Sequence, residues 1–167
     1  MSYYSHIDEI NKQIEYLLSG QFTEINVRCA PEFEDERLGK RREYIRYYYE
    51  SDDLISRNTD GETRDFMFSI SFYFQDFNKK DGFNSHVFYQ LDRLNWILCN
   101  EPTQNDTDDA YVWHDGRITG RERIQEVENI LEIRMTFVAT KTCMWGTAAN
   151  YAYGIYDFSD YGYSKYA

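Results

Sequence analysis

The sequence predicts an α+β protein, with an antiparallel or mixed β-sheet flanked by two amphipathic helices and followed by a Tyr-rich C-terminal extension. Two observations favour this class. In two segments, apolar residues recur at steps of three and four, the spacing that places them on one face of a helix. In other segments, apolar residues occupy every second position, as in a strand with one buried face. Each apolar face needs a partner, so we expect the helices to pack on the sheet.

The first expected element is a helix that begins after Ser5 and ends at Gly20. Its apolar residues recur on one side: Ile7, Ile10, Ile14, Leu17 and Leu18. The Ser5 hydroxyl can cap the free amides of the first turn. Gly20 can take the left-handed conformation that commonly ends a helix.

Three strands are expected next. Residues 25–29 alternate between apolar and polar side chains, and residues 44–49 are β-branched and aromatic. Between them, residues 32–43 carry charges of both signs and are expected to form a solvated loop. Residues 51–62 are expected to form a second, acidic loop. The clearest strand spans residues 64–75, and its alternate positions form one apolar face: Phe66, Phe68, Ile70, Phe72 and Phe74.

The second half of the chain predicts a helix, a hairpin and a last strand. Residues 83–98 have helical apolar spacing, and this helix is expected to cover the phenylalanine face. Residues 111–119 predict a tight hairpin centred on Asp115-Gly116, because both residues can adopt positive φ. Residues 121–126 are expected to form a turn or a short helix. Residues 131–140 alternate as the last long strand.

A single domain is expected over residues 1–140, because 167 residues are too few for two ordinary domains and a linker. Residues 141–167 form the extension, in which no apolar periodicity remains. Its tyrosines alternate with small and acidic residues: Tyr151, Tyr153, Tyr156, Tyr161, Tyr163 and Tyr166. Such a segment cannot bury enough surface alone, so we expect it to stay mobile or to order against a neighbouring subunit.

Composition narrows the function. The chain contains 18 Lys and Arg residues and 29 Asp and Glu residues. The resulting net charge of -11 disfavours binding to nucleic acid or anionic lipid. Aromatic residues make up 18% of the chain, and 16 of them are Tyr, which is enriched where protein surfaces meet. A Tyr-rich sheet in a monomer is the alternative. No apolar stretch has the length of a membrane span, so we expect synthesis in the cytosol and no membrane partner.

The residue types that carry catalysis do not assemble into a motif. The histidines, His6, His86 and His114, lack the spacing of zinc ligands. His114-Asp115 resembles an acid–base pair, but the expected turn already explains Asp115. The cysteines, Cys29, Cys99 and Cys143, form no C-x-x-C pair, and we expect reduced, mostly buried thiols. We expect no catalytic, cofactor or metal site, and keep an enzyme of unrecognised type as a minor alternative.

The charged loop at residues 32–43 favours a protein contact. Its basic residues are nearly neutralised by neighbouring acids, which suits ion pairs between subunits better than phosphate binding. The expected interface residues are those of this loop and of the extension: Glu34, Arg37, Arg41, Arg42, Tyr151, Tyr153, Tyr156, Tyr161 and Tyr163.

Three blocks of the sequence carry a family resemblance. They are RDFMFSISFYFQDF at residues 64–77, FYQLDRLNWILCNEP at 88–102 and YVWHDGRITGRERIQEVENILEIRMTFVA at 111–139. Over about residues 5–140, the chain resembles the tail terminator (tail completion) proteins of long-tailed bacteriophages. The Tyr-rich extension departs from that pattern, so another neck or tail-tube component is an alternative.

The resemblance implies a structural virion protein and no enzyme. Its subunits would form a six-membered ring that caps the tail tube and meets the head connector or stopper protein. Assembly would take place in the host cytoplasm, and the protein would end in the tail or neck of the virion. DNA would pass through the ring without specific binding, which an acidic lumen favours. The candidate lumen residues are Asp52, Asp53, Asp60 and Glu62, and a merely solvated loop is their alternative.

A monomeric adaptor or inhibitor that binds one partner through a Tyr-rich surface is the remaining hypothesis. Its mass in solution would distinguish it from a ring subunit.

Overall fold

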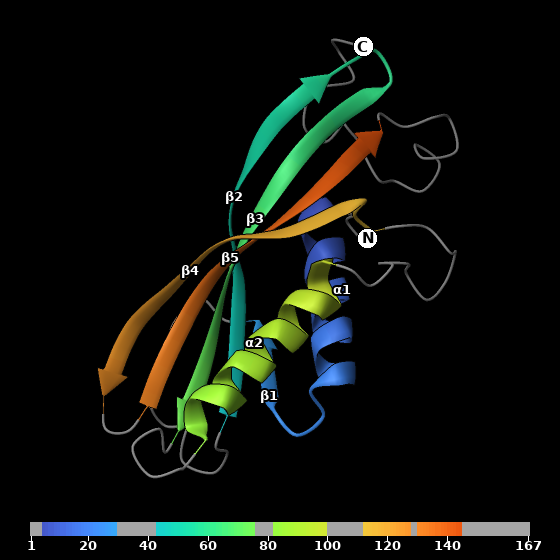
Figure 1. Cartoon of the computed structure of the whole chain (residues 1–167). Coiled ribbons are helices and arrows are strands. Elements are labelled where there is room, and N and C mark those ends of the chain that lie inside the picture. Colours follow the sequence, from blue (N-terminus) through green and yellow to red (C-terminus); the bar gives the residue numbers. More distant parts are fainter. Residues whose placement is uncertain (1–4, 30–42, 76–81, 100–111, 128–129, 145–167) are drawn as a thin grey trace.

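The computed structural model describes residues 5–29, 43–75, 82–99, 112–127 and 130–144. Two helices and five strands follow one another along these residues (Figure 1) in this order: α1 (His6–Gln21), β1 (Asn26–Cys29), β2 (Glu43–Arg57), β3 (Gly61–Gln75), α2 (Phe83–Cys99), β4 (Asp115–Val127) and β5 (Ile130–Met144). The strands form one sheet in the order β1-β2-β3-β5-β4. Only β1 and β2 are parallel, and the other neighbours are antiparallel. The predicted α+β class with a mixed sheet is confirmed.

Both helices cover the same face of the sheet. Phe22, just after α1, packs edge-on against Phe72 of β3, with 5.8 Å between ring centroids. Phe83, the first residue of α2, packs edge-on against Phe74 at 6.3 Å. The alternating apolar row of β3 is therefore the floor of the core, as predicted, and every member of it is buried.

The start of α1 is as predicted, but its end is not. The Ser5 side chain accepts a hydrogen bond from the Asp8 amide at 3.3 Å. The helix continues through Gly20 to Gln21, and the capping amide is that of Phe22, which donates to the Leu18 carbonyl at 2.8 Å. Burial of the Phe22 ring fixes this end, so the left-handed glycine expected at Gly20 is not needed.

Residues 51–57 belong to β2 and do not form the expected acidic loop. They pair with β3 through two irregularities, between Tyr49 and Ser51 and between Leu54 and Ser56. The actual turn is short, and the Asn58 side chain closes it by accepting hydrogen bonds from the amides of Asp60 at 2.9 Å and Gly61 at 2.8 Å. Pairing with β3 stabilises residues 51–57 as a strand, although their polar composition is typical of a loop.

The hairpin expected at Asp115-Gly116 and the turn or helix expected at 121–126 are also wrong. Both segments lie inside β4, whose first residue, Asp115, pairs with Thr140 of β5. Gly82 is the one glycine in the described part of the chain with positive φ, at 78°. Gly116 is required for a steric reason instead. A Cβ atom at this position would lie 2.5 Å from the Leu98 carbonyl oxygen.

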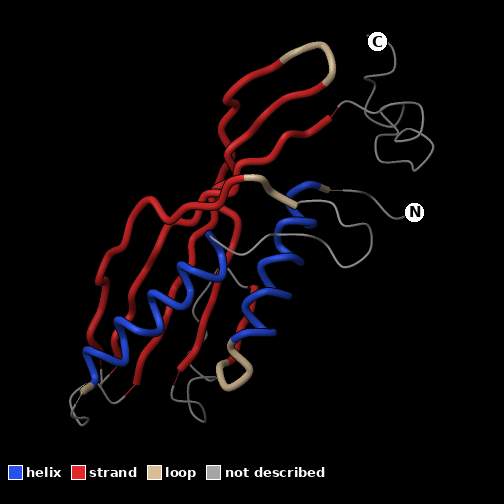
Figure 2. The backbone as a smooth tube through the Cα atoms, turned by 45° about the vertical axis from the view of Figure 1, so that its right-hand side comes forward, coloured by secondary structure: helices blue, strands red, loops and turns tan. Residues whose placement is uncertain are grey.

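One end of the sheet extends beyond the helices as a three-stranded arm, which consists of residues 51–57 of β2, 61–65 of β3 and 141–144 of β5 (Figure 2). The β1 strand pairs only with residues up to Tyr47 of β2, and β4 begins opposite Thr140. The last strand thus continues four residues past the expected boundary at residue 140, and residues 145–167 lie outside the described part of the chain.

Candidate interaction surfaces

Two of the four candidate lumen acids, Asp52 and Glu62, form ion pairs with the same arginine. Arg64 of β3 donates hydrogen bonds to the carboxylates of Asp52 and Glu62, and forms an ion pair with each. The two carboxylates raise the pKa of the Arg64 guanidinium. The Asp52 and Glu62 side chains are 22% and 13% exposed, so their charges are partly enclosed as well as paired.

The hydroxyl of Tyr49, three residues earlier on β2, donates to Asp52. Burial, followed by this hydrogen bond and the charge of Asp52, raises the pKa of Tyr49 to about 12. A network of one tyrosine, one arginine and two carboxylates thus holds β2 to β3 at the base of the arm.

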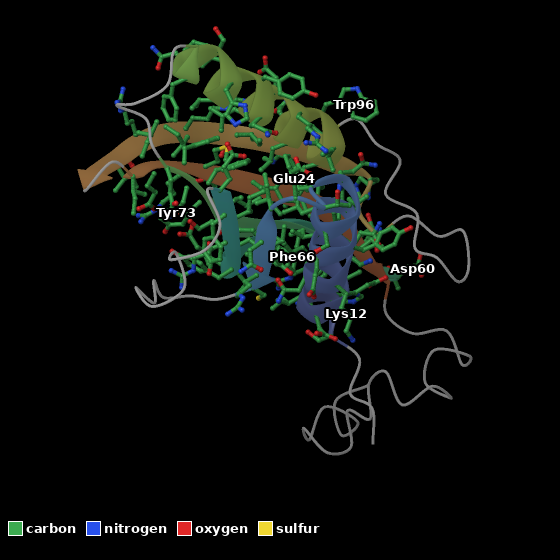
Figure 3. All side chains as sticks on the ribbon, turned by 90° about the horizontal axis from the view of Figure 1, so that it is seen from below. Lys12, Glu24, Asp60, Phe66, Tyr73 and Trp96 are labelled. Carbon is green, nitrogen blue, oxygen red and sulfur yellow. The ribbon has the colours of Figure 1, made fainter. Side chains whose placement is uncertain are left out.

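The other two candidates are separate and exposed. Asp53 pairs opposite Asp65 of β3, on the sheet face that α1 and α2 leave uncovered. Asp60 lies in the short turn between β2 and β3, at the periphery of the molecule (Figure 3). The structure therefore separates the predicted group into two carboxylates that share one arginine, and two exposed carboxylates.

A second ion-pair network crosses the uncovered face at the base of the arm. Asp65 accepts hydrogen bonds from the Arg117 guanidinium of β4 and from the Thr140 hydroxyl of β5. Arg117 also donates to Asp115 at 2.7 Å. Both carboxylates raise the pKa of Arg117 against the opposing effect of its burial. The three strands β3, β5 and β4 are thus joined by side-chain contacts as well as by the backbone hydrogen bonds of the sheet.

The uncovered face also contains buried polar residues. Ser71 donates to Glu132 at 2.9 Å, and both residues are buried. Arg134 pairs with the same carboxylate at 3.2 Å. Next to them, the rings of Tyr44 and Tyr73 pack at 5.8 Å, and burial raises the pKa of Tyr73. The sheet is therefore ordered by specific contacts on both faces.

The outer surface of α2 exposes three large aromatic side chains, which the sequence prediction missed. Phe88 and Tyr89 are each 63% exposed and Trp96 is 53% exposed. We call these three residues the aromatic stripe of α2. Figure 3 shows Trp96 at the outside of the molecule, away from Phe66 in the core. The available signal was that none of the three falls on the apolar period that predicted the helix.

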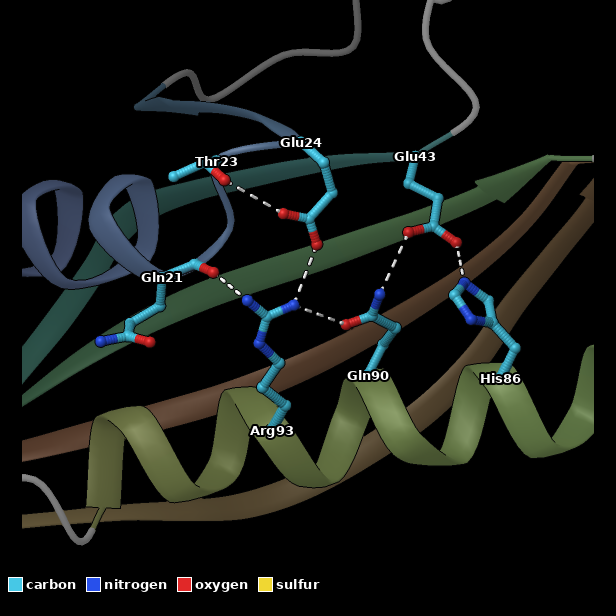
Figure 4. A network of polar contacts seen from close by, with 7 residues as sticks. All are labelled: Gln21, Thr23, Glu24, Glu43, His86, Gln90 and Arg93. Atoms are coloured by element: carbon cyan, nitrogen blue, oxygen red, sulfur yellow. Dashed lines mark hydrogen bonds and ion pairs between the residues drawn. The ribbon is translucent and has the colours of Figure 1, made fainter.

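A polar network positions α2 against the rest of the fold (Figure 4). Arg93 donates to Glu24 at 2.9 Å and to the Gln21 carbonyl, and its guanidinium lies 4.3 Å from the centre of the Phe22 ring. A backbone hydrogen bond lowers the pKa of Glu24 against the opposing effect of burial, and Arg93 lowers it further. The network joins α2 to the turn between α1 and β1.

Farther along α2, His86 and Gln90 both contact the Glu43 carboxylate of β2. A histidine beside a carboxylate can transfer protons in an enzyme. Here each group has its partner on a facing element, and we interpret the pair as a positioning contact between helix and sheet.

The remaining sequence candidates are placed as follows. Cys143 is buried, Cys99 is half-buried and Cys29 is exposed, so the expectation of mostly buried thiols fails at Cys29. In the described ranges, no group of three or more His, Cys, Asp or Glu side chains could hold a metal ion. Neither described helix is long and apolar enough to cross a membrane. The candidate interface residues of the 32–43 loop and of the Tyr-rich extension lie outside the described residues.

These features define an α+β protein with a mixed five-stranded sheet, two helices on one face and an arm at one end. The chain matches no protein-family model and no curated protein sequence. Among solved structures, it is similar to a chain of the "Virion of native gene transfer agent (GTA) particle", with 13% identity and a TM-score of 0.41 over 80% of this chain and 92% of the other.

A second similar structure, whose printed name states no function, has 14% identity and a TM-score of 0.43, over 84% of this chain and 97% of the other. At these values, the likenesses assign neither a family nor an activity.

Proposed function

We propose that this chain is a structural virion protein, a subunit of a six-membered ring that caps a phage tail tube and joins it to the head connector. The observation that supports this most is the three-stranded arm. The sequence resemblance to tail terminators over residues 5–140 supports it independently, because the expected order of helix, strands, covering helix and strands is the order found.

The arm exposes apolar side chains and a strand edge that the described part of its own domain does not cover. Strands of 15 residues span about 50 Å, whereas a 17-residue helix covers about 25 Å. Residues 51–57, 61–65 and 141–144 of the long strands therefore extend beyond the helices. Leu54 and Ile55, on the arm, are 49% and 54% exposed. In the described residues, no strand pairs with the outer edge of β2 beyond Tyr47, and such edges readily pair with another chain.

The arm carries a small negative charge: with Asp60 it has five acidic residues, against the three cations Arg57, Arg64 and Lys141. Asp53 and Asp60 are exposed carboxylates on or beside a projecting element, and the whole chain carries a net charge of -11. A ring that presented these groups to its lumen would repel phosphates and let DNA slide. Asp52 and Glu62 contribute less to such a field, because Arg64 compensates them.

Imaging of assembled particles tests the proposal. A subunit could remain monomeric until a tail tube templates it, so the copy number per particle is the decisive quantity. We expect six copies in one closed ring at the junction of tail and head, in contact with the tail-tube protein and the connector or stopper protein. A single copy per particle would refute the ring.

The aromatic stripe of α2 favours a second candidate, a monomeric adaptor that binds one partner through this surface. This adaptor would give a complex with one copy of the chain, at any protein concentration. Another neck or tail-tube component would give a ring at a different position in the particle, and imaging distinguishes these cases directly.

A further inference from the structure

The aromatic stripe of α2 is separate from the face that holds the helix in place. The buried positions of α2 include Val87, Leu91 and Leu94, which contact the core. Phe88, Tyr89 and Trp96 lie within about 100° of arc on the other side. At ~150–250 Å² for each aromatic side chain, their exposed parts total about 400 Å², which matches the largest apolar patches of monomeric proteins. The exposed carboxylate of Asp92 lies between Phe88 and Trp96 on this helix face, so the surface combines aromatic rings with one acidic group, a composition that suits docking of another protein segment.

We propose that this stripe is the docking site for the Tyr-rich segment 145–167 of a neighbouring copy of the chain. The proposal rests on the proposed ring, because it needs a second copy beside the first. It identifies the surface that would bury those tyrosines, which neither the sequence nor the proposed function specifies.

The geometry of β5 allows this contact. The Leu98 carbonyl, near the end of α2, lies against Gly116, and Gly116 pairs with Ala139 of β5. Met144 is five residues farther along the strand, about 17 Å away. The 23 residues that follow Met144 can span up to about 75 Å. At Met144 the strand has run past α2 to the end of the arm (Figure 1). The segment that follows is long enough to reach a neighbouring copy that lies within its span.

The chemistry of the two partners matches. The segment contains Trp145, Phe158 and six tyrosines, but only Asp157, Asp160 and Lys165 as charged groups. Aromatic rings pack on exposed aromatic rings in edge-on or offset arrangements, and tyrosine hydroxyls can remain solvated at the rim. A contact of this kind should be insensitive to salt, unlike one formed by the charged loop.

Photo-crosslinking in mixed assemblies tests the proposal. Full-length chain carrying p-benzoylphenylalanine at position 89 is prepared with heavy isotopes and assembled with unmodified light chain, and crosslinked peptides are identified by mass spectrometry. We expect crosslinks from the heavy α2 peptide to the light segment 145–167, at unchanged yield in 0.5 M salt. The double variant Phe88→Ser/Trp96→Ser should lower this yield about tenfold or more, the effect of losing interface anchors.

The matched control is Tyr16→Ser, which removes an aromatic ring of similar exposure, 54%, from α1 and should leave the yield unchanged. Crosslinks only within heavy chains, crosslinks only to other surfaces, or an absence of crosslinks would each overturn the docking proposal. Electron microscopy of the same samples tests the ring proposal separately from the docking proposal. Rings without heavy–light crosslinks refute the docking alone, whereas heavy–light crosslinks in an assembly that is not a ring refute the ring alone.

Discussion

The Lys141 ammonium lies 2.9 Å from the Glu9 carboxylate and 2.8 Å from the carbonyl oxygen of Val112. One buried lysine on β5 thereby joins the first turn of α1 to the segment that leads into β4. The side chain of Lys141 is 9% exposed and that of Glu9 is 23% exposed. Because charges are costly to bury without a partner, this pair fixes how α1 meets the base of the arm.

Removing the carboxylate should therefore destabilise the fold. Glu9→Gln leaves the Lys141 charge buried with only one strong acceptor, and we expect a loss of about 1–3 kcal/mol in the free energy of unfolding. Lys12→Gln is the matched control, because it removes the exposed pair of Lys12 with Asp8, and should cost under ~0.5 kcal/mol. Urea denaturation measures both. Equal effects of the two variants would contradict the structural role of Lys141.

Two glycines of β4 should respond oppositely to alanine. At Gly116, an added Cβ would lie 2.5 Å from the Leu98 carbonyl oxygen and 2.9 Å from Trp113 Nε1, so we expect Gly116→Ala to cost about 1–3 kcal/mol. At Gly120, no atom lies within 4 Å of the added Cβ, and Gly120→Ala should be neutral or stabilise by up to about 1 kcal/mol. Thermal unfolding checks the pair. A tolerated Gly116→Ala would show that α2 and β4 do not approach so closely.

Sequence periodicity predicted the elements whose one face is buried, and failed where a strand has no such face. The alternating phenylalanines of β3 and the periodic apolar residues of both helices form the core, so their spacing in the sequence reflects the face that each element buries. Residues 51–57 and 115–123 are instead rich in charged residues, and ion pairs such as Asp52–Arg64 and Asp65–Arg117 join them to neighbouring strands. A polar strand of this kind has the composition of a loop, and only its pairing with β3 or β5 identifies it.

The candidate surfaces could be predicted only in part for a related reason. The sequence grouped four acidic residues as one candidate surface, but Asp52 and Glu62 share Arg64 as their partner, and Asp52 reaches Arg64 only when β2 folds back on β3. The aromatic stripe of α2 was visible in the sequence as three residues outside the apolar period. The apolar period identifies the face that a helix buries, and carries no information on aromatic residues that the helix leaves exposed.

The three thiols should react in the order of their exposure. Burial raises the pKa of Cys143 to about 11 and also raises the pKa of Cys99. Cys29 is exposed to solvent, although partial burial of its thiol group raises its pKa too. With Ellman's reagent at pH 8, we expect Cys29 to react first and Cys143 only on unfolding. The fast phase should vanish in Cys29→Ser, and its persistence would mean that another cysteine is accessible.

Tyr49 should make stability decrease at high pH. Its pKa in the folded protein is about 12, above the ordinary value of about 10, so the unfolded chain loses this proton first. The stabilisation is complete below about pH 10 and is lost as the pH rises toward 12. Tyr49→Phe should reduce the slope of unfolding free energy against pH in that window. An unchanged slope would show that other tyrosines, such as Tyr47, dominate it.

Charge reversal of the candidate lumen acids should have two distinct effects, because the structure divides them into two pairs. Asp53→Lys/Asp60→Lys changes exposed groups, and we expect a change in unfolding free energy of under ~0.5 kcal/mol for each substitution. Asp52→Lys/Glu62→Lys places two cations beside Arg64, and should destabilise the arm clearly because like charges then replace two ion pairs.

The first pair therefore tests the lumen without disturbing the fold. If Asp53 and Asp60 face passing DNA, particles with the Asp53→Lys/Asp60→Lys variant should assemble in normal number but release DNA more slowly, because lysines hold the phosphates that aspartates repel. The rate of DNA release in vitro measures this, and higher salt should restore it by screening. Glu15→Lys, an exposed reversal on α1, controls for net charge when compared with Asp60→Lys alone, because each of these substitutions changes the net charge by the same amount. Normal release by the Asp53→Lys/Asp60→Lys variant at low salt would place these two residues outside the lumen, and the arm would then serve contact between subunits alone.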